Sequence, residues 1–456
     1  MKSKKVLRLL CWFSALSAFF LFSGCQEKSI NLHWGPTQEL NIELQTDAWN
    51  SSAMYVQLNQ AITLYQEQYP EVQVHITEVP CGYGDPYFKQ IGTRIMAGEG
   101  PDVLFFNNLF TTENDILKME KAGAFEDLTK AVQDDLNPKD YVQPIFEDSV
   151  YDGHQYLIPI SYSLPLFITT EEAASAVNLD FDRAQNTLEI LTELGDCKEK
   201  NPEVYLFSYP RFMLQTIHMS GMEYGDVQSG EITLDFELFH QLLDQWKRID
   251  PYSISEEDIR QIGQPQMNVL PIYKAIKEGR FTCSLGLYGY RDYFYTTQWF
   301  LQDTVPQFFP WRNMDGGITA MQDSALAIRR NAPNAQNAWN FIKVALSAEA
   351  QAAPIQDPIS TGYLPVNRSA WKIAYQEIYS NEIAYGNDTT SVGVQAVPKE
   401  RYNEFVKLQD EITGVSIRFP ADREIFELFT PYLEGTATFE ECQQKAEDFL
   451  FIYLSE

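Results

Sequence analysis

Residues 95–106, IMAGEGPDVLFF, decide the fold class of this chain. Ile95 ends a helical pattern whose apolar face also carries Phe88 and Ile91, and the Gly-Glu-Gly-Pro turn stops that helix. The run from Val103 to Phe106 is continuously apolar, as is typical of a strand buried on both faces of a parallel sheet. A helix that leads directly into such a strand predicts an α/β fold.

The residues before this stretch extend the same alternation. Leu40, Ile42 and Leu44 alternate with polar residues, which indicates a strand. Residues 58–65 carry a helical apolar face, and residues 72–76 alternate as a second strand. The order β-α-β-α-β predicts a parallel sheet with right-handed crossovers, whose ligands lie beyond the carboxyl ends of the strands.

The rest of the chain shows one unusually long strand pattern. In residues 153–170 two apolar segments flank Ser161, Tyr162 and Ser163, as if one strand ran from one lobe into another. Farther on we predict a strand at 281–287, an aromatic-dense loop at 288–300 and a small strand at 325–328. The C-terminal part is predicted to be mainly helical.

The first 25 residues predict export. Roughly 14 uncharged residues follow a basic start, fewer than the ~20 that a spanning helix needs, so residues 1–24 read as a secretory signal. Phe22-Ser23-Gly24-Cys25 resembles the bacterial lipobox, in which the cysteine is acylated, although Leu is usual where Phe22 stands. We therefore predict a lipidated Cys25 on the extracytoplasmic face of the cell membrane, followed by a tether to residue 37. An ordinary signal peptide with an incidental cysteine is the alternative.

Composition sets the class of partner. Without residues 1–24 the chain has 30 Lys and Arg against 63 Asp and Glu, a formal charge of −33. Such a surface repels nucleic acid and anionic lipid, so the acyl anchor alone should hold the protein at the membrane. About 430 mature residues suggest two or more lobes. The internal cysteines are far apart, and we expect buried thiols more than disulfides, with no metal site or cofactor.

Several segments together resemble the family of extracytoplasmic solute-binding proteins of ABC importers, in its carbohydrate-binding cluster. The resemblance covers about residues 38–456 and is carried, in order, by residues 61–74, 95–103, 122–128, 156–165, 334–351 and 362–368. Residues 178–200 depart from the family pattern.

This resemblance implies an α/β, two-lobe periplasmic-binding-protein-like fold, each lobe a mainly parallel sheet flanked by helices and joined by hinge crossings. The implied lobes are residues 38–161 plus 306–360, and 162–305 plus 361–456. The crossings would lie near 161–165, 303–307 and 361–366. The implied function is to capture a sugar in the interlobe cleft as a monomer and deliver it to ABC transporter permease subunits, with hinge closure as the mechanism.

Residues suited to sugar binding stand at the predicted strand ends and crossings. Aromatic rings suit the apolar face of a sugar, and amide or charged groups suit its hydroxyls. For each aromatic residue, packing in the core is the competing interpretation. The candidate ligand-binding residues are Trp49, Asn50, Asn107, Asn108, Tyr162, Tyr288, Tyr290, Trp311 and Arg312. For Asp102 we favour a structural role, in which it caps or turns the backbone before a strand.

Other functions stay open as alternatives. A sensory lipoprotein would present the same ligand to a membrane receptor. A secreted carbohydrate-active enzyme is the weaker alternative, because no G-x-S-x-G, H-E-x-x-H, P-loop or EF-hand motif is present. The sequence leaves open the identity and length of the sugar, and whether the ligand is another small solute such as a polyamine or a peptide.

Overall fold

The structure is a computed structural model of the chain, in which Pro36–Glu456 form one compact unit. The residues described are 38–46, 51–80, 87–107, 109, 116–147, 149–207, 212–249, 276–279, 281–301, 304–356, 363–375, 382–385, 390–393, 397–417, 419 and 421–455.

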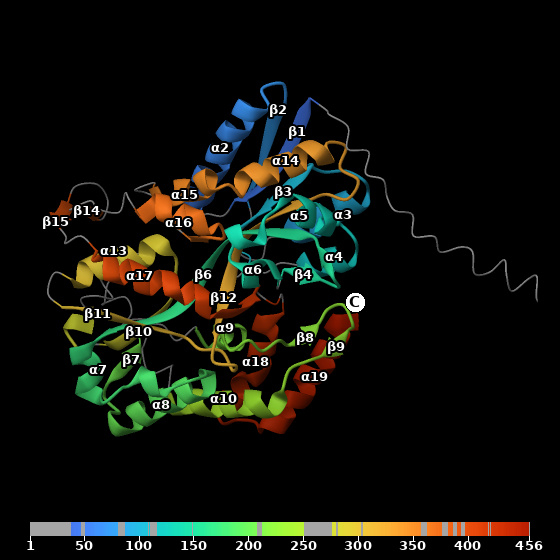
Figure 1. Ribbon diagram of the computed structural model, residues 1–456. Helices are drawn as coiled ribbons and strands as arrows, with labels where there is room; N and C mark the ends of the chain where they lie inside the picture. Colours follow the sequence, from blue (N-terminus) through green and yellow to red (C-terminus); the bar gives the residue numbers. More distant parts are fainter. Residues whose placement is uncertain are drawn as a thin grey trace, which may run out of the picture. The chain divides into compact units, whose positions relative to one another are not determined.

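A mixed sheet is the centre of the fold (Figure 1), and its described strands follow the order β2-β1-β3-β12-β6-β10-β7. In addition, β11 and β13 pair with β6, and β16 pairs with β12. The strands are β1 (Glu39–Thr46), β2 (Gln73–Pro80), β3 (Val103–Phe106), β6 (Leu157–Thr170), β7 (Tyr205–Phe207), β10 (Phe281–Tyr288), β11 (Pro306–Pro310), β12 (Ile318–Ile328), β13 (Leu364–Pro365) and β16 (Ile412–Ser416). Pairing is parallel at both ends of the path and antiparallel around β6 and β12. Short hairpins join β4 (Val150–Tyr151) to β5 (His154–Gln155), β8 (Gly225–Asp226) to β9 (Glu231–Ile232), and β14 (Glu382–Tyr385) to β15 (Thr390–Gly393).

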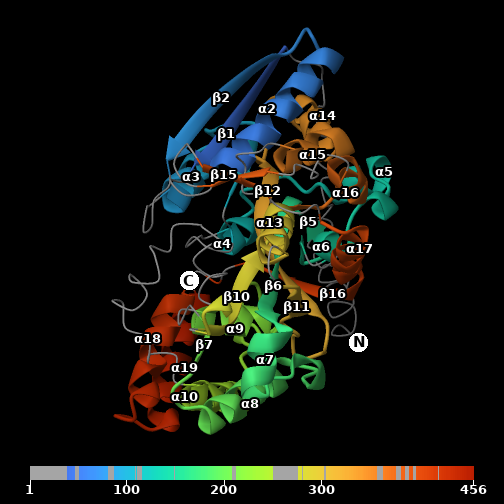
Figure 2. The same cartoon turned by 90° about the vertical axis from the view of Figure 1, so that its left-hand side faces the viewer.

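Helices gather at the two ends of this path. Figures 1 and 2 show α2, α14 and α15 beside the β1 end, and α8, α10, α18 and α19 at the β7 end. The α-helices are α2 (Ser51–Gln68), α3 (Tyr87–Met96), α4 (Ile116–Lys121), α5 (Thr129–Asp135), α6 (Gln143–Glu147), α7 (Glu171–Val177), α8 (Thr187–Lys200), α9 (Phe212–Met219), α10 (Phe236–Ile249), α13 (Tyr290–Phe300), α14 (Ala335–Ala345), α15 (Ala348–Gln356), α16 (Arg368–Tyr375), α17 (Lys399–Lys407), α18 (Asp422–Leu433) and α19 (Phe439–Ser455). Among the described residues, no helix is long and apolar enough to cross a bilayer.

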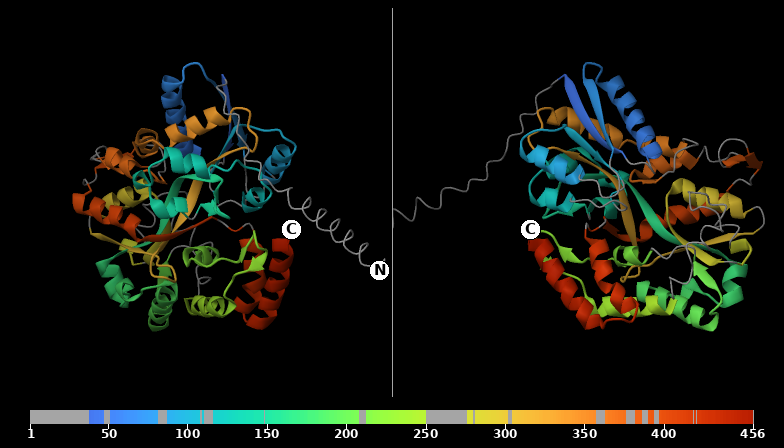
Figure 3. Two further views of the ribbon diagram at one scale, coloured as in Figure 1. Left: turned by 45° about the vertical axis from the view of Figure 1, so that its right-hand side comes forward. Right: turned by 180° about the vertical axis from the view of Figure 1, so that it is seen from behind.

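The predicted long strand is confirmed as β6, which is buried along its whole length. Leu157 at its start belongs to one hydrophobic core cluster and Phe167 near its end to another. On β12, Ala325 lies in the first cluster and Met321 in the second. The two long strands therefore connect two apolar cores, and the views in Figure 3 show both strands running through the middle of the fold.

One expectation about local structure was wrong, and a second was correct but too short. Residues 290–300 form α13 rather than a loop, because the buried Tyr293, Thr297 and Phe300 follow the four- and three-residue spacing of one helical face. The small strand expected at 325–328 is the end of the 11-residue β12. Its polar centre hid the rest of the strand from the apolar pattern.

The structural role expected of Asp102 is confirmed. Its buried carboxylate accepts hydrogen bonds from the backbone and side-chain nitrogens of Asn41 and Asn334. It thereby ties β1 to the start of α14, two segments far apart in the sequence.

Candidate functional site

The predicted site residues at the N-terminal strand ends lie mostly outside the described residues. This holds for Trp49, Asn50 and Asn108, and also for the predicted lipidation site Cys25. Asn107 is described: it follows β3 directly and is 1% exposed.

Two of the predicted aromatic residues are fully buried. Tyr162, in the middle of β6, is 0% exposed. Trp311 is also 0% exposed: its ring stacks on Phe167 at 5.4 Å between centroids, and its Nε1 donates to Thr187 Oγ1 at 2.9 Å. Neither ring offers a free face in this structure. Both therefore pack in the interior, and a stacking role does not follow from this geometry.

The remaining predicted residues are Tyr288, Tyr290 and Arg312. Tyr288 is 7% exposed and its ring meets Phe308 edge-on at 5.7 Å. Tyr290 is the first residue of α13. The guanidinium of Arg312 pairs with Glu411 at 2.9 Å and donates to the Gly316 carbonyl, so it is already engaged within the protein.

Asn107 belongs to a buried group of polar side chains that we call the strand-end cluster. Its members are Gln45, Asn107, Ser161, Asp323 and Ser324, and each is at most 6% exposed. Gln45 is the penultimate residue of β1, and Asn107 directly follows β3. The other three lie in the middle of long strands, Ser161 on β6 and both Asp323 and Ser324 on β12.

Hydrogen bonds connect the members of the strand-end cluster. The Asn107 backbone N–H donates to Gln45 Oε1 at 3.3 Å, and Asn107 Oδ1 lies 3.4 Å from Ser324 Oγ. Ser161 Oγ lies 2.8 Å from Ser324 Oγ, and both hydroxyls donate to Asp323 Oδ2. Yet Gln45 Nε2 and Asn107 Nδ2 are buried without a hydrogen-bond partner among the residues that the structure describes. Each such donor costs ~1–3 kcal/mol, so the pair is suited to receive acceptor oxygens from a ligand.

Sequence reasoning found only Asn107 of this cluster. The run Gln322-Asp323-Ser324 was missed, although apolar residues stand on both sides of it. Three polar residues inside a strand that is buried throughout are the signal that would have indicated it.

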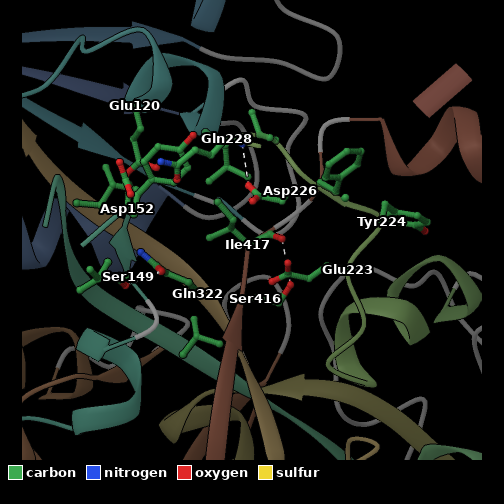
Figure 4. A pocket seen from close by; sticks show the side chains of 18 of the residues that line it. Glu120, Ser149, Asp152, Glu223, Tyr224, Asp226, Gln228, Gln322, Ser416 and Ile417 are labelled. Carbon is green, nitrogen blue, oxygen red and sulfur yellow. Dashed lines mark hydrogen bonds between the residues drawn. The ribbon is translucent and has the colours of Figure 1, made fainter. Parts of the chain in front are cut away.

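A separate cavity of about 330 Å³ is lined by Gln322, which directly precedes Asp323 of the cluster, and by none of the cluster's own side chains. Its walls come from α4, β4, the start of β6, α9, β8, β12 and β16. Figure 4 shows Glu120 reaching from α4 toward Asp152, with Ser149 and Gln322 below them and Asp226 and Gln228 opposite.

Among the described residues, no group of three or more His, Cys, Asp or Glu side chains is placed to hold a metal ion. Cys197, Cys283 and Cys442 are buried free thiols, as expected, while Cys81 lies outside the described residues.

Comparison with known families gives a clear assignment. Residues 60–381, more than half of the 456-residue chain, match the family described as bacterial extracellular solute-binding protein. The chain belongs to this family. It is therefore an extracytoplasmic solute-binding protein, and its family is one of binding proteins rather than enzymes. The comparison with curated proteins finds no match.

Solved structures confirm the fold of this solute-binding protein. The sugar-binding protein MalE from Xanthomonas citri is 13% identical with a TM-score of 0.64, over 91% of this chain and 97% of that one. An extracellular solute-binding protein of family 1 from Alicyclobacillus acidocaldarius is 14% identical with a TM-score of 0.59, over 92% and 100%. An ABC substrate-binding protein from Listeria monocytogenes, in complex with cycloalternan, is 14% identical with a TM-score of 0.55, over 92% and 100%. The α/β periplasmic-binding-protein fold expected from the sequence is thus confirmed, with a mixed sheet.

Proposed function

We propose that this solute-binding protein captures a sugar or oligosaccharide outside the cytoplasm and delivers it to the permease of an ABC importer. The observation that carries the proposal is the pair of buried, unpartnered amide donors in the strand-end cluster, Gln45 Nε2 and Asn107 Nδ2. They stand where parallel strands end, the position at which α/β sheets bind ligands. Sugar hydroxyl oxygens accept hydrogen bonds of this kind.

Similar proteins support a carbohydrate ligand. The relative from Xanthomonas citri is a sugar-binding protein, and the one from Listeria monocytogenes holds cycloalternan. In the proposed arrangement, residues 38–161 plus 306–360 form one lobe, and 162–305 plus 361–456 form the other. A sugar that contacts both lobes favours the closed form, since a ligand shifts a conformational balance only by its differential affinity.

The proposal includes the anchor. A diacylated Cys25, after removal of residues 1–24, would hold the protein at the extracytoplasmic face of the membrane. There it would be close to the permease, because two acyl chains rarely leave a bilayer.

The strand-end cluster can be tested by a change that separates binding from folding. Asn107→Ala removes an unpartnered donor, and Ser324 Oγ keeps its hydrogen bond to Asp323. Calorimetric titration with a panel of neutral mono- to tetrasaccharides should give affinity for at least one, weakened roughly 3- to 10-fold in Asn107→Ala with an almost unchanged melting temperature.

Asn201→Ala is the matched control. The side-chain nitrogen of Asn201 donates to the carbonyls of Val177 and Cys197, so its loss should lower stability by ~1–2 kcal/mol and leave sugar affinity unchanged. Equal sugar affinity in the wild type and Asn107→Ala, or no affinity for any member of the panel, would contradict the proposal.

A further inference from the structure

The cavity in Figure 4 is strongly acidic. Four carboxylates line it, those of Glu120, Asp152, Glu223 and Asp226, whereas its described lining contains no Lys or Arg. Lys121 on α4 donates from Nζ to the Val227 carbonyl at 2.7 Å, and its charge helps to lower the pKa of Asp226. The described lining, which also includes His218, therefore has more acidic than basic groups.

Glu120 is the most unusual of these groups. The residue is only 4% exposed, and its carboxyl group makes no hydrogen bond or ion pair with any residue in the described part of the chain. Burial raises the pKa of Glu120 to about 8. A buried carboxyl without a partner is costly, and protein interiors nearly always supply one. Its position, directed into a cavity, indicates that the missing partner is a bound molecule.

Gln322 is a second, independent observation in the same cavity. The residue is 2% exposed; its Oε1 accepts from Ser149 Oγ at 3.3 Å, and its Nε2 has no partner within the described part of the chain. The cavity thus presents a buried carboxyl group, which a bound cation would keep ionised at neutral pH, and an amide N–H that needs an acceptor oxygen. A simple metal ion would satisfy only the first, and no metal-ligand group was found among the described residues.

We propose that this cavity is a second ligand site, which binds a small ammonium-bearing polyol such as an amino sugar. The ammonium group pairs with Glu120, and a ligand hydroxyl accepts the Nε2–H of Gln322. A volume of about 330 Å³ accommodates roughly eleven water-sized groups at ~30 Å³ each, which is about the size of one hexose ring. The proposal does not depend on sugar binding at the strand-end cluster.

Glucosamine and glucose form a matched pair of probes, because an ammonium group in one replaces a hydroxyl in the other. Titration calorimetry at pH 7 on the full chain should show glucosamine bound roughly 10- to 100-fold more tightly than glucose, the effect of a charge-assisted hydrogen bond. In Glu120→Gln, which is nearly isosteric, this preference should fall to within about 3-fold.

Glu67→Gln removes the same charge from an exposed position on α2 and should leave the preference unchanged. The proposal is wrong if the wild type binds the two hexoses equally, or if the preference persists in Glu120→Gln. Sugar binding that is lost in Asn107→Ala but not in Glu120→Gln belongs to the strand-end cluster, so the two proposals fail separately.

A crystal structure of the wild-type protein with glucosamine provides a test that needs no variant. The ammonium nitrogen within hydrogen-bond distance of Glu120 supports the proposal. Glucosamine bound only elsewhere, or absent at a concentration that saturates the calorimetric signal, overturns it.

Discussion

Glu120 should make the stability of this protein depend on pH in an unusual direction. Because burial raises its pKa from 4.5 to about 8, the folded state holds a proton on Glu120 that the unfolded state has released. The free energy of unfolding should therefore fall as the pH rises from about 4.5 to about 8, and this contribution becomes constant above that range. Most carboxylates act in the opposite sense, since pairing lowers their pKa.

The size of the effect follows from the same values. About 2.5 pH units separate the ordinary pKa of 4.5 from pH 7, and each unit corresponds to ~1.4 kcal/mol. Wild-type protein should therefore lose ~3 kcal/mol relative to Glu120→Gln between pH 4.5 and pH 7. Tyr151 and Tyr156 interact electrostatically with Glu120, and Asp152, Asp226 and His218 line the same cavity. Lys121, the next residue on α4, donates to the Val227 carbonyl and helps to lower the pKa of Asp226, and the described lining holds no Lys or Arg that pairs with Glu120.

Urea unfolding at pH 5, 6, 7 and 8 measures this difference directly. Subtracting the Glu120→Gln curve from the wild-type curve cancels the other titrating groups, and Glu67→Gln should run parallel to the wild type. A wild-type minus Glu120→Gln difference that is constant over this range would refute the reasoning. So would a difference that grows in favour of the wild type as the pH rises, because that sign requires a lowered pKa.

Three further outcomes are expected. Trp311→Ala should lower the free energy of unfolding by ~3–5 kcal/mol in thermal melts, since the ring is fully buried. A variant that stays stably folded but loses sugar affinity would instead show that Trp311 contacts the ligand. Asp102→Ala should cost at least ~3 kcal/mol in urea unfolding, because it leaves the donors of Asn41 and Asn334 buried without their acceptor; a cost under ~1 kcal/mol would contradict this. Cys25→Ala should release the protein from the membrane or leave its precursor uncleaved, and cell fractionation showing normal processing and retention would exclude the lipid anchor.

The order of strands and helices over the first part of the described chain, residues 38–106, was predictable because it depends on local patterns. Leu40, Ile42 and Leu44 alternate along one strand, and Val103–Phe106 form a short apolar run whichever residues cover it. Periodicity of this kind depends on backbone geometry alone. The same reasoning failed for α13. Aromatic residues stand on several sides of this helix, so the spacing of the buried Tyr293, Thr297 and Phe300 is not evident from the sequence alone.

The environment of single side chains was decided only by the tertiary structure. The ring of Trp311 is in the core because Thr187 and Phe167 come from distant parts of the chain to cover it. Gln322 interrupts an apolar run in the sequence, and only the pairing of β12 with β6 shows that it is buried.

Glu120 is the clearest case. In the sequence it is one of 63 acidic residues, and nothing in its neighbours distinguishes it from the others. It becomes buried because α4 lies against the β8 region, where Lys121 reaches the Val227 carbonyl across 106 positions in the sequence. Burial and the lack of a partner, which together set its pKa, depend on contacts between distant segments, and a local pattern carries no information about these.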